Sequence, residues 1–125
     1  MKKIINTKEA PAPIGPYNQS VQFGNLLFVS GQICLDPVTG KLNMDNLEIE
    51  THQVMRNLGA ILKEAGSSFD KVIKSSIFLS DMNSFAQINE IYGSYFSGDF
   101  PARETVEVAC LPKNVNVEIS VIAYV

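Results

Sequence analysis

Residues 115–125, with the sequence VNVEISVIAYV, alternate strictly between two kinds of side chain. One set is apolar throughout, and it consists of Val115, Val117, Ile119, Val121, Ala123 and Val125. The other set mixes polar with large apolar residues, and it consists of Asn116, Glu118, Ser120, Ile122 and Tyr124. Such alternation is typical of a β-strand with one buried face, because successive side chains point to opposite sides of a sheet. The chain must therefore build a sheet and cover one of its faces.

A segment in the middle of the chain has a different period, with apolar residues at every third or fourth position. This spacing is typical of one face of an α-helix, and it predicts a helix over residues 47–65. Gly66 ends that helix, because glycine readily takes the left-handed conformation beyond a helix end. Asp45 and Glu48 resemble a capping pair at the start, and Glu50 adds negative charge to the first turn. The apolar face of this helix supplies part of the cover that the sheet needs.

A second helix is predicted to begin near Asp81 or Asn83 and to end at Gly98. Its buried stripe is expected to consist of Phe85, Ile88, Tyr92 and Phe96. Further strands are predicted at residues 18–23, 26–31, 71–79 and 103–109. Gly24-Asn25 separates the first two strands and is a signal for a two-residue hairpin turn. The order of elements is thus β-β-α-β-α-β-β.

This order predicts an α+β fold, a mixed sheet with both helices packed on one face. The 125 residues suffice for one hydrophobic core, so we expect a single domain over residues 1–125. We expect the face away from the helices to carry Arg103, Glu107, Glu118, Ser120, Ile122 and Tyr124. A face that mixes charges with large apolar side chains is a candidate subunit interface.

Charge and residue usage exclude several classes of function. The net charge is −3, and apart from Lys2-Lys3 the basic residues are scattered, so nucleic-acid binding is disfavoured. Cys34 and Cys110 are expected to be reduced, buried thiols, and His52 to be a surface histidine without metal-ligand spacing. We therefore expect no metal and no cofactor. No apolar run approaches the roughly 18 residues of a membrane span and no secretory signal precedes the domain, which favours a cytoplasmic protein without membrane contact.

The segment FPARETVEVACLPK contains Arg103, one of two arginines in the chain. An arginine at the start of a strand is either a solvated charge or a ligand for an anion. Its planar guanidinium offers about five donors and binds a carboxylate through two parallel hydrogen bonds. Strand alternation places the neighbouring Glu104 away from Arg103. If the strand begins irregularly, Glu104 instead pairs with Arg103 and competes with an external anion.

Four stretches together resemble the RidA/YjgF family of enamine/imine deaminases: GPYNQ, VSGQI, FPARETVEVACLPK and VNVEISVIA. The most specific feature is P-A-R followed, after a valine-rich strand and a short loop, by V-E-I. The resemblance spans essentially the whole chain. It implies a chorismate-mutase-like fold that assembles as a homotrimer, with ligand sites in clefts between the subunits.

The resemblance also implies roles for individual residues. Arg103 is expected to bind the carboxylate of a 2-imino or 2-amino-2-enoic acid, and Glu118 to hold or activate the attacking water. Further residues are expected to line the cleft, namely Tyr17, Ser30, Gly31, Asn89 and Thr105. Thr105 stands where some relatives carry a cysteine. The implied reaction yields a 2-oxo acid and ammonia, and it needs neither a metal nor a covalent nucleophile.

Two other functions remain open from the sequence. One is the endoribonuclease or translation inhibitor of the older family label, although the chain has no basic patch and no paired histidine for RNA cleavage. The other is a trimer that binds small carboxylates without catalysis. Both the deaminase and the binding protein would need Arg103.

Overall fold

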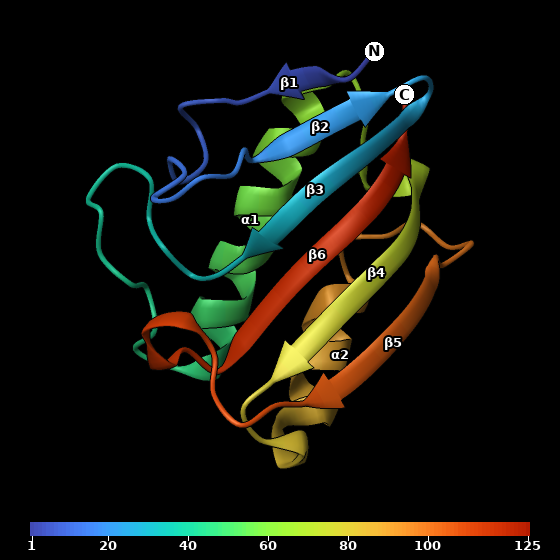
Figure 1. Ribbon diagram of the computed structural model, residues 1–125. Coiled ribbons are helices and arrows are strands. Elements are labelled where there is room, and N and C mark those ends of the chain that lie inside the picture. Colours follow the sequence, from blue (N-terminus) through green and yellow to red (C-terminus); the bar gives the residue numbers. More distant parts are fainter.

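The alternating C-terminal segment forms strand β6 (Val117–Tyr124), which lies inside a six-stranded sheet (Figure 1). The computed structural model describes residues 1–125. The other strands are β1 (Lys3–Ile5), β2 (Ser20–Phe23), β3 (Leu26–Gln32), β4 (Val72–Leu79) and β5 (Ala102–Glu107). They follow the order β1-β2-β3-β6-β4-β5, and only β4 and β5 pair in parallel. The predicted mixed sheet is confirmed, and β1 is an additional edge strand that the sequence did not reveal.

Helices α1 (Leu47–Glu64) and α2 (Phe85–Gly93) both cover the same face of the sheet, as predicted (Figure 1). The cap of α1 is Asn46, whose side chain accepts a hydrogen bond from the Ile49 N–H, so the predicted capping pair was wrong by one position. Helix α2 ends at Gly93 instead of Gly98, and residues 94–100 form an irregular connection to β5. Neither helix is both long and apolar enough to span a membrane.

The hydrophobic core fills the space between the two helices and the sheet. Alternate residues of β6 from Val117 to Ala123 are buried there, as the period of two predicted. Helix α1 contributes Val54, Met55, Leu58, Ile61 and Leu62, all fully buried. Because the core occupies only this side, the opposite sheet face stays open, and we call it the open face.

The open face carries Glu118, Ser120, Ile122 and Tyr124, as predicted. The expectation that Arg103 and Glu107 share this face was wrong. Arg103 pairs across the sheet with Ser75, which in turn pairs with the buried Val121. Residues paired in this way point to the same side, so Arg103 lies on the helix side of the sheet. Glu107 does so too, since its Oε1 accepts a hydrogen bond 2.7 Å long from the Met82 N–H.

The proline-rich N-terminal segment is held to the sheet by Gln19. The buried Gln19 side chain donates hydrogen bonds to the carbonyl oxygens of Thr7, Ala10 and Pro11. Its Oε1 accepts a hydrogen bond from the Thr7 N–H. A segment without regular structure thereby gains a defined path, and this path brings Tyr17 close to the end of β3.

The cysteines and the histidine differ in part from the expectation. Cys34 is a buried free thiol whose pKa is raised to about 11, chiefly by burial and further by the negative charge of Glu50. Cys110 is exposed, so its predicted burial was wrong. It lies in the loop between the edge strand β5 and strand β6. His52 is partly buried, and its Nδ1 lies 2.7 Å from the Tyr95 hydroxyl.

Candidate functional site

Arg103 projects from the start of β5 toward helix α2. Its guanidinium carbon lies 5.4 Å from the ring centre of Phe85 and 5.3 Å from that of Tyr92. Its Nη1 donates a hydrogen bond to Asn89 Oδ1, 2.7 Å away. No carboxylate of the chain pairs with it, since the one ion pair within the chain joins Lys74 and Glu104. Aromatic faces and one amide thus hold the guanidinium in place, and most of its donors stay free for an external anion.

Glu104 does not compete for Arg103, because it points to the open face. Its carboxylate accepts a hydrogen bond from the Ser76 hydroxyl and lies 3.0 Å from Lys74 Nζ. These two contacts, the Ser76 bond first, lower the pKa of Glu104. The alternation within β5 therefore separates the two neighbouring charges, as predicted.

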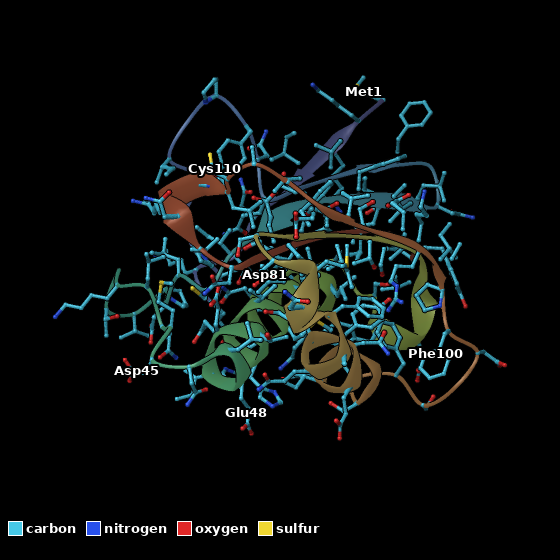
Figure 2. All side chains as sticks on the ribbon, turned by 90° about the horizontal axis from the view of Figure 1, so that it is seen from below. Met1, Asp45, Glu48, Asp81, Phe100 and Cys110 are labelled. Atoms are coloured by element: carbon cyan, nitrogen blue, oxygen red, sulfur yellow. The ribbon has the colours of Figure 1, made fainter.

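A hollow of about 430 Å³ lies in front of Arg103. It is lined by Asn89, Tyr92, Gly93, Phe100, Pro101 and Arg103. Phe100 is 64% exposed, and Figure 2 shows it at the level of the helices, beyond α2. An exposed phenylalanine next to a free guanidinium gives the hollow one apolar and one cationic wall. The sequence analysis did not single out Phe100, although it opens the FPAR motif.

Thr105 follows Arg103 on the same side of β5. Its Oγ1 is buried and is the one buried side-chain polar atom of the chain without a hydrogen-bond partner. An unpaired buried hydroxyl is costly, which makes Thr105 an unusual position of the sheet. Arg103, Asn89 and Thr105 form a group that we call the arginine half-site.

Glu118 lies on the open face of β6 and is half-buried. No group of the chain donates a hydrogen bond to its carboxylate, and burial raises its pKa above the ordinary value for glutamate. A methyl group built on Gly31 would lie only 2.9 Å from Cδ of Glu118. Glycine at position 31 therefore leaves the space that the carboxylate occupies.

A β-bulge brings Gly31 to this position. The pairing of β3 with β6 is regular up to Val29–Val121 and resumes at Gln32–Ile119, so Ser30 and Gly31 form the irregular step. Ser30 Oγ donates a hydrogen bond 2.6 Å long to the carbonyl of Asn18. This bond ties the bulge to the residue that follows Tyr17. Bulges commonly redirect side chains near functional sites.

Tyr17 completes this side. Its ring is half-exposed and lines a small hollow of about 50 Å³ together with Gly31 and Lys113. Its backbone N–H donates to the carbonyl of Gly15, 2.8 Å away, which gives a tight turn after the prolines. Glu118, Gly31, Ser30 and Tyr17 form a group that we call the glutamate half-site.

The two half-sites lie on opposite sides of the same sheet. The arginine half-site faces the helices at the β5 edge, whereas the glutamate half-site lies on the open face of β6 and β3. One chain therefore brings Arg103 together with Asn89 and Thr105, and Glu118 together with Tyr17, Ser30 and Gly31. It does not bring Arg103 to Glu118. The two groups belong to one site only if a second copy of the chain contributes one of them.

Known proteins resemble this chain over nearly its whole length. A family model described as Endoribonuclease L-PSP matches residues 7–125. A RutC family protein of Pyrococcus horikoshii is 50% identical over 124 residues, which cover 99% of this chain and 98% of the relative. The 2-iminobutanoate/2-iminopropanoate deaminase of Mus musculus is 47% identical over 123 residues, 98% of this chain and 91% of the relative. The structure of E. coli TdcF with bound serine matches with a TM-score of 0.93 at 40% identity and covers 98% of each chain.

Proposed function

Because the chain belongs to the L-PSP endoribonuclease family, also called the RidA/YjgF family, we propose that it hydrolyses 2-imino acids and their 2-amino-2-enoic tautomers to 2-oxo acids and ammonia. The observation that carries this proposal is the guanidinium of Arg103, held between Phe85, Tyr92 and Asn89 without an anionic partner. A carboxylate is the anion that such a planar fork binds best. Small 2-imino acids such as 2-iminobutanoate carry this carboxylate beside the reactive carbon.

We further propose that three copies of the chain form a homotrimer in which the arginine half-site of one copy faces the glutamate half-site of the next. The opposite placement of the two half-sites favours such a shared site. So does the open face, where large apolar side chains stand uncovered, among them Phe28 and Val106. A second copy would remove this apolar area from water, which stabilises an assembly in proportion to the area buried.

The chemistry needs one anion-binding group and one group that accepts and donates protons. Arg103 would hold the substrate carboxylate in the hollow that it lines with Asn89. Water adds to C2, and its proton passes to Glu118 as the oxygen–carbon bond forms. Glu118 returns this proton to the nitrogen, and the C2–N bond of the carbinolamine then breaks as its hydroxyl proton passes to the carboxylate of Glu118, which leaves the 2-oxo acid and ammonia. The raised pKa of Glu118 suits this exchange, because it increases the fraction of protonated carboxyl groups near neutral pH while the ionised form stays available.

Two named relatives support the reading. The mouse relative is named for the deamination of 2-iminobutanoate and 2-iminopropanoate. The E. coli relative TdcF was crystallised with serine, a small molecule with a carboxylate and a nitrogen on the adjacent carbon. The same functional groups occur in the proposed substrates.

The test combines the purified protein with a threonine dehydratase and threonine, which generate 2-iminobutanoate in place. The decay of the imine and the formation of 2-oxobutanoate are followed against buffer and against Arg103→Ala. We expect faster decay only with the wild-type protein. Equal decay in all three samples would exclude the deaminase. If wild-type protein still bound 2-oxobutanoate and Arg103→Ala did not, the protein would be a carboxylate-binding trimer without catalysis.

The family description also names RNA as a substrate. A net charge of −3 and a single histidine do not favour RNA cleavage. Cleavage of RNA that survives further purification, and that is lost on substitution of a named residue, would establish that function instead.

A further inference from the structure

Glu50 is a fully buried carboxylate that the proposed chemistry does not use. It lies in the first turn of α1, where the sequence suggested only a charge near the helix start. Figure 2 shows its neighbour Glu48 pointing away from the sheet. Glu50 instead points inward and reaches the beginning of β6.

Three hydrogen bonds connect Glu50 to the two residues that precede Glu118. Oε2 accepts from the backbone N–H of Asn116 at 2.7 Å and from that of Val117 at 3.2 Å, and Oε1 accepts from Asn116 Nδ2 at 2.8 Å. An ionised carboxylate offers acceptors only, so it matches a cluster of N–H donors with no donor left over. Bonds to a charged acceptor are stronger than neutral ones, which makes this a firm anchor.

The anchor lies where β6 pairs with only one neighbouring strand. The pairing of β6 with β3 begins only at Ile119–Gln32, so residues 116–118 have a neighbouring strand on the β4 side alone. On that side the Ser80 N–H donates to the carbonyl of Asn116. Glu50 adds hydrogen bonds to a part of β6 that β3 does not pair with. Glu118 is the next residue in the chain, and its carboxylate fits beside Gly31 with little free space.

We propose that Glu50 is a positioning residue for the reaction: it holds the start of β6 so that the carboxylate of Glu118 stays in its place beside Gly31. The inference rests on the proposed role of Glu118 in the deaminase. Glu50 itself touches neither the open face nor the hollow in front of Arg103. Its effect therefore falls on the rate of the chemical step and leaves carboxylate binding by Arg103 unchanged.

The test is Glu50→Gln in the dehydratase-coupled assay. Glutamine preserves the shape, but its amide NH2 replaces one of the two oxygens that accept from the N–H groups of Asn116 and Val117. We expect kcat to fall by about tenfold or more, because small displacements of a catalytic group cost rates of this order. KM and the Kd of 2-oxobutanoate, which depend on Arg103, should change less than about twofold.

Ile61→Val serves as the matched control, because Ile61 is a fully buried residue of the same helix without contact to β6 through hydrogen bonds. It should lower the melting temperature and leave kcat unchanged. Folded Glu50→Gln with wild-type kcat would overturn the inference, as would a kcat loss no greater than that of the control. If Glu50→Gln does not fold, Glu50→Asp keeps the charge on a shorter side chain. Its kcat should then lie below the wild-type value, and an unchanged kcat would again overturn the inference.

The same assay distinguishes a failure of the proposed function from a failure of this inference. An inactive wild-type protein, or a Glu118→Gln variant as active as wild type, removes the proposed function and this inference with it. An active wild type, an inactive Glu118→Gln and a fully active Glu50→Gln remove this inference alone.

Discussion

Arg103 contacts its own chain through its flat faces and one nitrogen. Phe85 and Tyr92 pack around the guanidinium, and Asn89 accepts from Nη1. The other donors of the guanidinium have no side-chain partner in the chain. A side chain held in this way loses little conformational entropy when it binds a carboxylate.

Replacing Arg103 by lysine keeps the charge but removes the fork and the packing on the two rings. We expect kcat/KM to fall by about one to two decades, since a hydrogen bond to a charged group contributes roughly 1.5–3 kcal/mol. Steady-state kinetics in the dehydratase-coupled assay measure the loss, and the melting temperature should stay nearly constant.

Glu104→Ala is the control, because Glu104 is adjacent in sequence yet bonds to Ser76 and Lys74 on the open face. It should leave kcat and carboxylate affinity unchanged. Full activity of Arg103→Lys would mean that Arg103 is a solvated surface charge.

Glu118 is a half-buried carboxylate that accepts no hydrogen bond from the chain, and burial raises its pKa above the ordinary value for glutamate. Its folded-state pKa exceeds the unfolded value, so the folded protein binds this proton more tightly. The free energy of unfolding therefore decreases as pH rises from the ordinary pKa of glutamate through the raised one. Glu118→Gln removes this loss, and the variant should melt at a higher temperature than wild type at pH 7 and at a similar temperature near pH 3.

The same substitution should lower kcat by about 10²- to 10⁴-fold, the usual contribution of a general acid–base group. In wild type, kcat should rise with pH around a midpoint above the ordinary pKa of glutamate, as Glu118 loses its proton. Melting curves and pH–rate profiles on the same samples measure both effects. An inactive Glu118→Gln variant that is less stable than wild type at pH 7 would contradict the expectation that the charge of Glu118 destabilises the folded protein.

At the scale of elements, the bulge in β3 decides where Glu118 can lie. Ser30 and Gly31 interrupt the pairing with β6, and the absence of a side chain at Gly31 leaves room for the carboxylate. The backbone at Gly31 is not in the left-handed region, whereas Gly24 in the hairpin turn has φ of 60°. The two glycines are therefore needed for different reasons, one for space and the other for conformation.

Gly31→Ala should displace the flexible end of Glu118 without straining the backbone. We expect kcat to fall by about tenfold or more while the melting temperature changes little. Gly24→Ala should lower the melting temperature and leave kcat unchanged. Nothing lies near the added methyl group, but the left-handed conformation costs an alanine about 1 kcal/mol. Melting curves and coupled kinetics of the two variants form a matched pair. Unchanged kcat in Gly31→Ala would show that Glu118 needs no such space.

At the scale of the whole molecule, the sheet separates the two half-sites, and only assembly can join them. A trimer should have about three times the chain mass of 13.7 kDa in light scattering on a sizing column. A monomer at micromolar concentration would exclude the shared site.

Mixed trimers give a sharper measurement. Arg103→Ala and Glu118→Gln should each be inactive alone. In every mixed trimer of the two, one of the sites pairs an intact Arg103 with an intact Glu118 from the neighbouring copy. Refolding the variants together at equal amounts should therefore restore about a quarter of the wild-type activity. No recovery, with exchange of subunits verified by mass, would contradict a site shared between copies.

The sequence by itself determined the α+β content, the buried faces of α1 and β6, and the motifs that identify the family. Periodicity carries this information because it is local: it reports which side chains of one element share a side. It also separated Arg103 from Glu104, which needs only the alternation within β5.

Only the tertiary structure decided which side of the sheet Arg103 occupies. Strand β5 lies at the edge and is exposed at nearly every position, and its apolar Val106 lies on the open face, so its alternation does not show which side meets the helices. Its parallel pairing with β4 sets the side, and that pairing joins residues far apart in the chain. The burial of Glu50 and the space beside Gly31 depend in the same way on contacts with distant segments. In sequence, a glutamate in a first helical turn looks the same whether it faces water or is buried. A glycine in a strand likewise looks the same whether or not a carboxylate fills the space beside it.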